Sequence, residues 1–286
     1  MSRAAALRSI PPLQLSGSWQ MAIDEWLLDR AVVHGTGADG ATPAAVLRFY
    51  TWSRPTLSLG FHQQRLQPRW LELAGRGELQ LIRRPSGGRA VLHAAALTYA
   101  LIWPQAPSRR REAYRAACSW LQHGFAELGL PLRFGAGPAD PHHPSCFATS
   151  TAADLIHGDG GKRIGSAQLW RRGVLLQHGS ILLHPEVALW RRVLAEEPPR
   201  LEPLSLSPEQ LIRVLEQAAR RHLPIAAADW CVDPLSPQEW SAIAARRGRY
   251  RIEPAPFTEQ GGAQSEQQAM RLTQPVESSG DRPHRS

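Results

Sequence analysis

A twin-glycine turn between two short apolar runs is the feature of this sequence that most restricts its fold. The segment from Leu81 to His93 reads LIRRPSGGRAVLH, with the turn at Gly87 and Gly88. Paired glycines adopt backbone conformations that other residues avoid, and they let backbone N–H groups approach a ligand closely. Most such pairs occupy ordinary tight turns, so the turn alone does not identify a site.

Arginines surround this turn, and they supply nearly all of the basic excess of the chain. The net charge is +8, and Lys162 is the only lysine among the 286 residues. The guanidinium groups of Arg84 and Arg89 are suited to holding a carboxylate, a phosphate or an acidic partner surface. Charge alone does not choose between nucleic acid, anionic lipid and acidic protein, and a solvated basic surface is the simpler interpretation.

The cysteine pattern and the hydropathy indicate a soluble protein of a reducing compartment. Cys118, Cys146 and Cys231 form no CxxC pair, so neither a disulfide framework nor a zinc site is indicated. No stretch reaches the roughly 20 apolar residues of a membrane span, and no secretory signal is recognisable. We therefore expect a cytoplasmic protein with no membrane partner.

Two other common ligand sites are also not indicated by the sequence. His142 and His143 are adjacent in a proline-rich loop, so they point in different directions and predict no metal site. The chain lacks GxxxxGK[ST] and lacks GxGxxG between a strand and a helix. A nucleotide, if bound, would need another mode of binding.

Apolar periodicity predicts a β-rich first half and helices near the end. Helices are expected over 18–33, 111–128, 186–194, 208–220 and 237–246. Strands are expected over 46–52, 56–60, 79–83, 154–157, 163–170 and 174–183, the last three as an antiparallel meander with glycine at its corners. Cys118 falls on the apolar face of a helix, which predicts a packing residue.

Cys146 and Lys162 are the residues with the clearest chemical potential. Cys146 ends an irregular loop rich in Gly, Pro and His, where a thiolate could act as a nucleophile. The alternative is a small buried hydrophobic residue. The Lys162 ammonium could donate to an acyl carbonyl or a phosphate, with Gly165 permitting close approach, although in isolation it reads as a surface lysine. His93 and His178 each read either as a packed strand residue or as a group that lines a site.

Six sequence blocks, taken in order, resemble the biotin/lipoate protein ligase superfamily. The blocks are MAIDE at 21–25, RPTLSLG at 54–60, RRPSGGRAVLH at 83–93 with LTY at 97–99, SCF at 145–147, KRIGSAQ at 162–168 and QHGS at 177–180. The resemblance is to the lipoate branch, and in particular to its cysteine-dependent octanoyltransferases. It implies an α/β fold: a mixed, largely antiparallel sheet flanked by helices. We expect this catalytic domain over 13–253, and a disordered tail over 254–286.

The resemblance also implies the roles of individual residues. Cys146 corresponds to the nucleophile, and Lys162 to the lysine that contacts the acyl carbonyl. The substrate pocket would be formed by Arg84, Ser86, Gly87, Gly88, Arg89, His93, Gly165, Ser166, Ala167, His178 and Gly179. Ala94 stands where family members commonly carry an acidic residue, which leaves a base role for His93 open. Val46, Leu57, Leu81, Val91 and Ile164 are candidates to line an acyl tunnel, and core packing explains them equally well.

The activity implied by the resemblance is octanoyl transfer in protein lipoylation. The octanoyl group would pass from acyl carrier protein through Cys146 to a lysine of a lipoyl domain, in the glycine cleavage H protein or a 2-oxoacid dehydrogenase E2 subunit. No cofactor would be required, because the donor thioester supplies the free energy. The arginine surplus would suit the acidic partners that the resemblance implies.

Two other functions are weighed against octanoyl transfer. An ATP-dependent lipoate ligase would need ATP and Mg²⁺ and would form lipoyl-adenylate, but the residues after Leu194 are too few for the accessory domain of many such ligases. A noncatalytic basic module would bind nucleic acid with a steep salt dependence. We expect neither.

Overall fold

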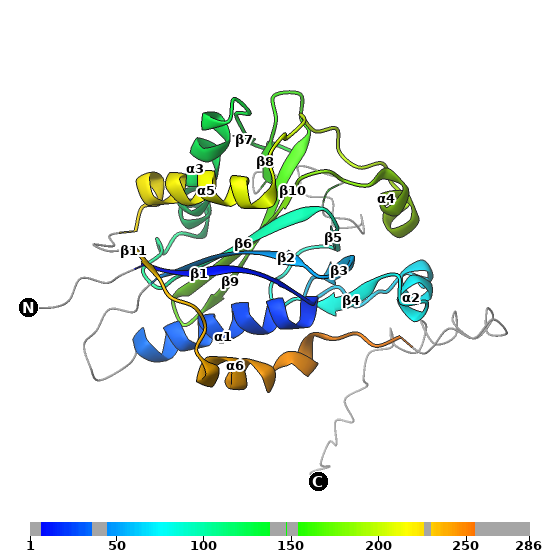
Figure 1. Ribbon diagram of the computed structural model, residues 1–286, viewed down its shortest axis with the longest axis horizontal. Helices are drawn as coiled ribbons and strands as arrows, with labels where there is room; N and C mark the ends of the chain where they lie inside the picture. Colours follow the sequence, from blue (N-terminus) through cyan, green and yellow to red (C-terminus); the bar gives the residue numbers. More distant parts are fainter. Residues whose placement is uncertain (1–6, 36–44, 138–146, 148–153, 226–229, 255–286) are drawn as a thin grey trace, which may run out of the picture.

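Eight strands form one large sheet in the computed structural model, which describes residues 7–35, 45–137, 147, 154–225 and 230–254 (Figure 1). These strands are β1 (Leu7–Leu15), β2 (Val46–Trp52), β6 (Ala96–Trp103), β7 (Arg133–Phe134), β8 (Asp154–Ile156), β9 (Lys162–Arg171), β10 (Val174–Leu182) and β11 (Trp230–Val232). Their spatial order is β11-β1-β2-β6-β10-β9-β8-β7. The pairs of β1 with β11 and β2 are parallel, and all later pairs are antiparallel.

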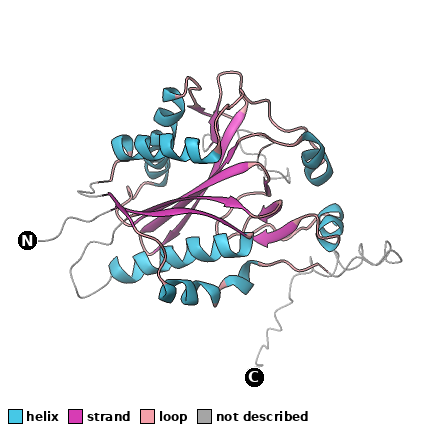
Figure 2. Ribbon diagram, viewed as in Figure 1, coloured by secondary structure: helices cyan, strands magenta, loops and turns pink. Residues whose placement is uncertain are grey.

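Helices cover both faces of this sheet (Figures 1 and 2). The elements concerned are α1 (Gly17–Gly35) and α6 (Pro237–Ala244) on one face, and α3 (Arg110–Glu127) and α5 (Pro208–His222) on the other. Alternate residues of a strand point to opposite faces, so Phe49, Tyr99 and Leu101 pack toward α3, whereas Tyr50 and Ala100 pack toward α1. The apolar side chains of both layers therefore bury the sheet on each side.

A second, smaller sheet lies beside the large one and carries the twin-glycine turn. Its strands are β3 (Thr56–Leu59), β4 (Gln80–Arg83) and β5 (Val91–His93), in the order β4-β3-β5. Its core includes residues of the short helices α2 (Pro68–Gly75) and α4 (Val187–Leu194), among them Trp70 and Trp190. The 3₁₀ turn η1 (Arg247–Tyr250) follows α6 and contacts α1. Both ends of the glycine turn are thus anchored in a packed unit.

The predicted fold class is confirmed: a mixed, largely antiparallel sheet is flanked by helices. The predicted meander over 154–183 is present as β8, β9 and β10. The sequence pattern misses β1, whose run is broken by Pro11 and Pro12, and the register with β2 shifts at that point, between Ile10 and Leu13. It also misses β6, because a strand buried on both faces is continuously apolar and does not alternate.

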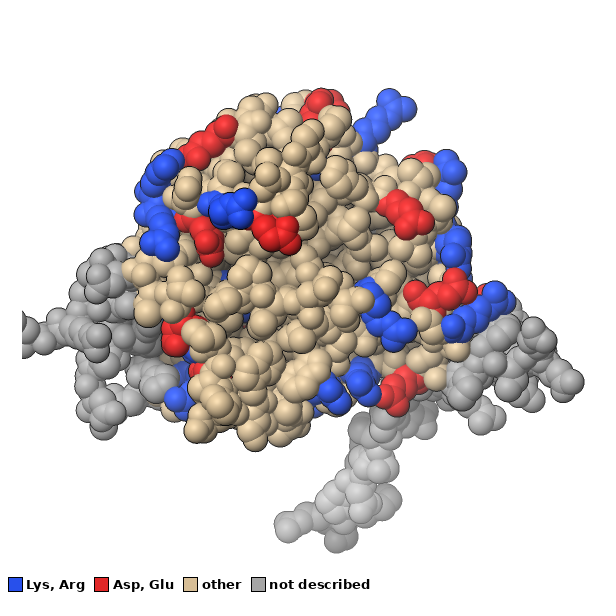
Figure 3. Space-filling model, viewed as in Figure 1, with Lys and Arg blue, Asp and Glu red and all other residues tan. Residues whose placement is uncertain are grey.

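The surface shown in Figure 3 carries acidic and basic side chains interspersed, not one continuous basic area. Several arginines form ion pairs, as Arg8 does with Glu239 and Arg221 with Glu127. Within the described ranges, no helix combines the length and the apolar character needed to cross a membrane. The predicted tail lies outside the described residues apart from Pro254, and the limits of the domain stay a prediction.

Candidate functional site

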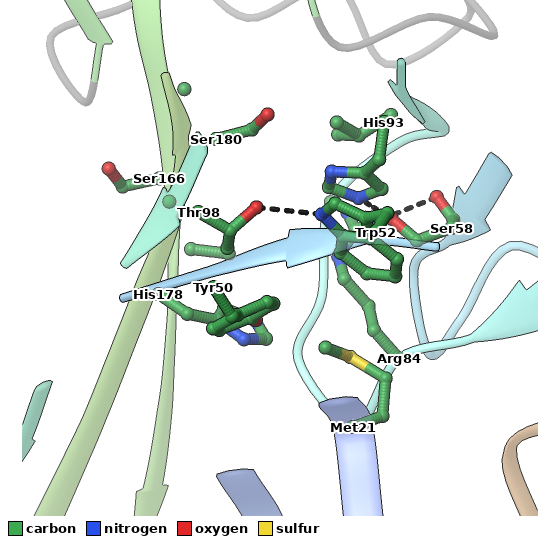
Figure 4. Close-up of a pocket in the computed structure, with 15 residues that line it drawn as sticks. Met21, Tyr50, Trp52, Ser58, Arg84, His93, Thr98, Ser166, His178 and Ser180 are labelled. Carbon is green, nitrogen blue, oxygen red and sulfur yellow. Dashed lines mark hydrogen bonds between the residues drawn. The ribbon is translucent and has the colours of Figure 1, made fainter. Parts of the chain in front are cut away.

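A cavity lies on the α1 face of the large sheet, where two rows of cross-strand neighbours form one wall (Figure 4). Tyr50, Thr98, Ser180 and Gly165 are paired in turn across β2, β6, β10 and β9. Directly paired residues of antiparallel strands project from the same face. The next row on this face is Arg48, Ala100, His178 and Ala167.

The small sheet and its glycine turn close the cavity from the other side. The lining residues are Met21, Tyr50, Trp52, Ser58, Arg84, Gly88, Val91, His93, Thr98, Gly165, Ser166, Ala167, His178, Gly179 and Ser180. The cavity and its open mouth together hold about 470 Å³ of empty space. A ligand here would contact both sheets at once.

The Arg84 side chain holds the glycine turn in shape. Its guanidinium donates to the carbonyl oxygens of Gly87 at 2.8 Å, Arg89 at 2.7 Å and Ser58 at 2.8 Å. Backbone carbonyls engage several of its N–H donors, and the residue also lines the cavity, so the prediction that Arg84 holds an anionic ligand stays a prediction. Arg89 contributes its carbonyl oxygen to this arrangement and does not line the cavity.

Close backbone contact fixes the position of the turn. A Cβ atom at Gly60 would lie 1.7 Å from the carbonyl oxygen of Gly88, and Gly88 has a φ of 96°. That φ is in the left-handed region where glycine is favoured. Nothing lies within 4 Å of the position of a Cβ at Gly87. Of the glycine pair, Gly88 has the conformational requirement and lines the cavity.

A buried hydrogen-bond chain connects helix α1 to the turn. The Asp24 carboxylate lies 2.8 Å from Arg48 Nη1, and its Oδ2 lies 3.0 Å from both the Tyr50 hydroxyl and His178 Nδ1. An ionised carboxylate only accepts hydrogen bonds, so His178 Nδ1 carries the hydrogen. His178 Nε2 lies 2.6 Å from Ser86 Oγ. Ser86 therefore acts on the cavity through His178, because it does not itself line it.

The ring of His93 lies in a tight and apolar setting. It stacks on Trp52 with ring centroids 3.9 Å apart, and its Nε2 lies 2.8 Å from Ser58 Oγ. Burial lowers the pKa of His93 well below 6.5, and the positive charge of Arg84 lowers it further. His93 is therefore neutral at physiological pH.

This burial predicts a loss of stability in acid. The unfolded His93 takes up a proton below about pH 6.5, whereas the folded ring resists it. The free energy of unfolding should therefore fall as the pH drops below 6.5, by at most about 1.4 kcal/mol per pH unit for one such group. Urea unfolding between pH 7.5 and 5 measures this slope, to which buried His157 also contributes because its pKa is lowered. The His93→Asn variant should show a shallower slope; an unchanged slope would contradict the prediction.

Lys162 does not line the cavity but lies next to Gly165, which does, and a buried carboxylate holds it. Its Nζ is 2.9 Å from Asp154 Oδ1, with both side chains at most 5% exposed, and 4.8 Å from the centre of the Phe147 ring. A Cβ at Gly165 would be 3.5 Å from this Nζ. Gly165 lines the cavity and has no side chain, so no Cβ atom stands between this part of the cavity wall and the Lys162 ammonium.

Lys162 also borders an open groove on the outer side of this wall. The groove is lined by Phe147, Asp159, Gly160, Gly161, Lys162, Glu197, Pro199 and Arg200. The expectation that Lys162 is a surface lysine in isolation is wrong, since it is 3% exposed. Lys162 thus lines this groove and is the neighbour of a residue that lines the cavity.

The predicted nucleophile Cys146 lies outside the described residues, so its role stays a prediction. Cys118 is confirmed as a packing residue: it is fully buried on the inner face of α3, and burial raises the pKa of its thiol to about 12. A thiol with that pKa supplies almost no thiolate at neutral pH. Cys231 is exposed on β11.

Most of the predicted pocket residues meet at the cavity. Eight of them line it, namely Arg84, Gly88, His93, Gly165, Ser166, Ala167, His178 and Gly179. Ser86, Gly87 and Arg89 do not line it, and instead bond to His178 or Arg84. Of the tunnel candidates only Val91 lines the cavity; Val46, Leu57, Leu81 and Ile164 pack in the hydrophobic cores.

Six lining residues were not predicted, and three of them share a pattern that the sequence does carry. Tyr50, Thr98 and Ser180 lie on the α1 face of three neighbouring strands. Buried hydroxyl groups at alternate positions of apolar strands could have indicated them, but only with the strand order known. Asp24 belongs to the MAIDE block, and its contact with His178 cannot be read from the sequence because 154 residues separate the two.

Comparison with models of protein families decides which family the chain belongs to. The family model of the lipoyl protein ligase A/B catalytic domain matches residues 16–227. The chain belongs to this family. That match includes the cavity wall, the glycine turn and Lys162, so the family's catalytic domain contains every described site residue named above.

Known members of this family are similar in sequence or in fold. An octanoyltransferase LipM of Symbiobacterium thermophilum is 40% identical over 187 residues, which are 62% of this chain and 65% of that protein. The chain thus matches slightly less than two thirds of the length of that relative. A LipM of Carboxydothermus hydrogenoformans is 37% identical over 193 residues, 65% of this chain and 68% of that protein.

Solved structures of the lipoyl protein ligase family share the fold. A lipoate-protein ligase A bound with ATP has a TM-score of 0.68 at 20% identity, and covers 86% of this chain and 95% of its own. A putative lipoate protein ligase from T. acidophilum has a TM-score of 0.66 at 19% identity, over 84% and 93%. At these identities the likeness concerns the fold alone.

Proposed function

We propose that this chain transfers an octanoyl group from an acyl carrier protein thioester to a lysine of a lipoyl-domain protein, through a thioester on Cys146. The similarity to octanoyltransferases at up to 40% identity supports this activity. The structural observation that carries the proposal is the apolar cavity whose wall, at Gly165, leaves the Lys162 ammonium beside it.

The chemistry proceeds in two acyl transfers. The Cys146 thiolate attacks the donor thioester carbonyl, the bond to the carrier sulfur breaks, and the carrier thiol leaves with a proton. The target amine then attacks the new thioester, the C–S bond to Cys146 breaks, and an amide forms as the amine loses a proton. Thioester exchange is nearly neutral in free energy, and amide formation is downhill. No cofactor is required in this scheme.

Lys162 serves this scheme by stabilising the acyl oxygen. A fixed positive charge in a site that excludes water stabilises the negative charge that develops on a carbonyl oxygen. Asp154 positions the ammonium through the 2.9 Å ion pair. The groove that Lys162 lines supports the proposal, since a partner bound in it would lie beside this side chain.

Acceptors in this proposal are lipoyl domains, such as those of the glycine cleavage H protein and 2-oxoacid dehydrogenase E2 subunits. Octanoyl-acyl carrier protein is the donor, and both partners are expected to present acidic surfaces to the arginine-rich chain. An ionic strength above about 0.15 M should then weaken association, because it screens exposed charges beyond about 8 Å.

Intact-protein mass spectrometry after mixing with octanoyl-acyl carrier protein tests the proposal. Wild type and a Cys231→Ser control should each gain one octanoyl group that hydroxylamine removes, and Cys146→Ser should gain none that hydroxylamine removes. Adding a lipoyl domain should then move the group to the acceptor. Transfer by Cys146→Ala at the native rate, or lipoate-dependent release of pyrophosphate from ATP, would overturn the covalent scheme in favour of an ATP-dependent ligase.

A further inference from the structure

Two buried polar atoms that line the cavity have no hydrogen-bond partner within the described part of the chain. They are His93 Nδ1 and Ser180 Oγ. The two residues are only 6% and 3% exposed. Buried polar groups in native proteins are nearly always paired, and an unpaired one calls for a specific explanation. Two such atoms on residues that line one cavity point to a polar group on the ligand.

The hydrogen-bond network assigns the hydrogen on His93. Ser58 Oγ lies 2.8 Å from His93 Nε2 and 3.3 Å from Arg84 Nη1. Arginine only donates, so the Ser58 oxygen accepts from Arg84 and its own hydrogen is available to His93 Nε2. A neutral imidazole that accepts at Nε2 carries its hydrogen on Nδ1. In the tautomer assigned from this network, His93 presents an N–H donor at Nδ1.

Ser180 lines the cavity next to Gly165, the neighbour of Lys162. It pairs directly with Gly165 across β10 and β9, and the Cβ atoms of such pairs lie about 5 Å apart. The position of a Cβ at Gly165 is in turn 3.5 Å from Lys162 Nζ. Figure 4 shows Ser180 and His93 on facing sides of the cavity. One small polar group could therefore meet both donors close to the ammonium.

We propose that the His93 Nδ1–H and Ser180 Oγ–H groups donate jointly to the carbonyl oxygen of the bound acyl group. A carbonyl oxygen has two lone pairs and accepts two hydrogen bonds. Donors fixed in place before the reaction stabilise the oxygen most as it gains negative charge. This inference rests on the proposed function, because an acyl ligand supplies the carbonyl. It also makes His93 a binding donor and excludes it as the general base.

Binding of N-methyloctanamide labelled with ¹³C at its carbonyl tests the donor pair without using the catalytic cysteine. Titration calorimetry gives the affinity, and isotope-edited infrared spectroscopy gives the carbonyl stretch, which hydrogen bonds move to lower frequency. Ser180→Ala should weaken binding about five-fold, as expected for one lost hydrogen bond, and raise the frequency. The control is Ser9→Ala. Ser9 lies on β1, outside the cavity, is as buried as Ser180, and forms a hydrogen bond with Glu216.

Two His93 variants distinguish the donor from mere packing. The amide of asparagine falls near the position of Nδ1, and that of glutamine near Nε2. His93→Asn should therefore keep a carbonyl frequency closer to wild type than His93→Gln does. Circular dichroism shows whether each variant is folded. If the variants of one residue do not fold, the measurements on the other residue still test the donor pair.

The outcomes separate this inference from the proposed function. Amide binding with the wild-type affinity and carbonyl frequency in Ser180→Ala and both His93 variants would overturn the donor pair, even with an octanoyl adduct present on Cys146. The donor pair would be supported if the variants shift the affinity and the carbonyl frequency as predicted. If the wild-type enzyme at the same time forms no octanoyl adduct, the covalent scheme is rejected. The two results are measured on different samples and do not depend on each other.

Discussion

Replacing Lys162 with methionine is expected to lower the rate of octanoyl transfer about 100-fold to 1,000-fold, the usual effect of removing one preorganised charge or donor from an acyl-transfer site. The ammonium is 2.9 Å from Asp154, and it lies beside the cavity wall at Gly165. Methionine preserves the length and much of the volume of the side chain. The loss should appear in the single-turnover rate with saturating octanoyl-acyl carrier protein.

The same substitution should also destabilise the fold, and this effect must be separated from catalysis. Asp154 would remain buried without the cation that neutralises it, and breaking a buried ion pair costs about 3–5 kcal/mol. The Lys162→Met/Asp154→Asn double variant removes both charges, so most of the stability should return while transfer stays slow. Urea unfolding and single-turnover kinetics on the same preparations measure the two effects. A double variant that transfers at the wild-type rate would show that the ammonium has no part in the chemistry.

Gly60→Ala is expected to displace the glycine turn and lower transfer about 100-fold, as misplacement of a reacting group by about 1 Å can do. A Cβ at this position would lie 1.7 Å from the Gly88 carbonyl oxygen. That atom belongs to the backbone, so no side-chain rotation can relieve the clash. Overpacking of this kind also destabilises a fold by about 1–3 kcal/mol.

Gly248→Ala is the matched control for this substitution. Nothing lies within 4 Å of the position of a Cβ at Gly248, so its transfer rate and unfolding midpoint should stay near those of wild type. A crystal structure of Gly60→Ala should show the 86–89 segment moved away from β3. Equal transfer rates for Gly60→Ala and Gly248→Ala would mean that the position of the turn does not control the site.

Local sequence pattern was sufficient for most individual elements. The bounds of β2 match the prediction, and α3, α5 and β10 differ from it by no more than two residues at either end. Their apolar residues recur with the period of the element that they form, and that period depends on the backbone geometry of a few neighbouring residues. The glycine turn, Lys162 and His178 were recognisable for a similar reason, since each belongs to a short block.

The partners of these residues depended on the tertiary structure. Arg84 was expected to hold a ligand anion, and the structure shows that its guanidinium donates to carbonyls of its own turn and of Ser58 on β3. Asp24 and His178 are separated by 154 residues and meet in the interior. Ser180 became a candidate donor only when β10 was found between β6 and β9.

The chain alone therefore specified which segments become helices or strands and which side chains carry reactive groups. The family resemblance added where those groups were expected to act. The order of the strands decided which groups share a cavity, which charges are neutralised and which donors are left for a ligand. The physical reason is that periodicity arises from contacts a few residues apart, whereas a buried hydrogen bond or ion pair depends on two distant segments being packed to within about 3 Å of each other.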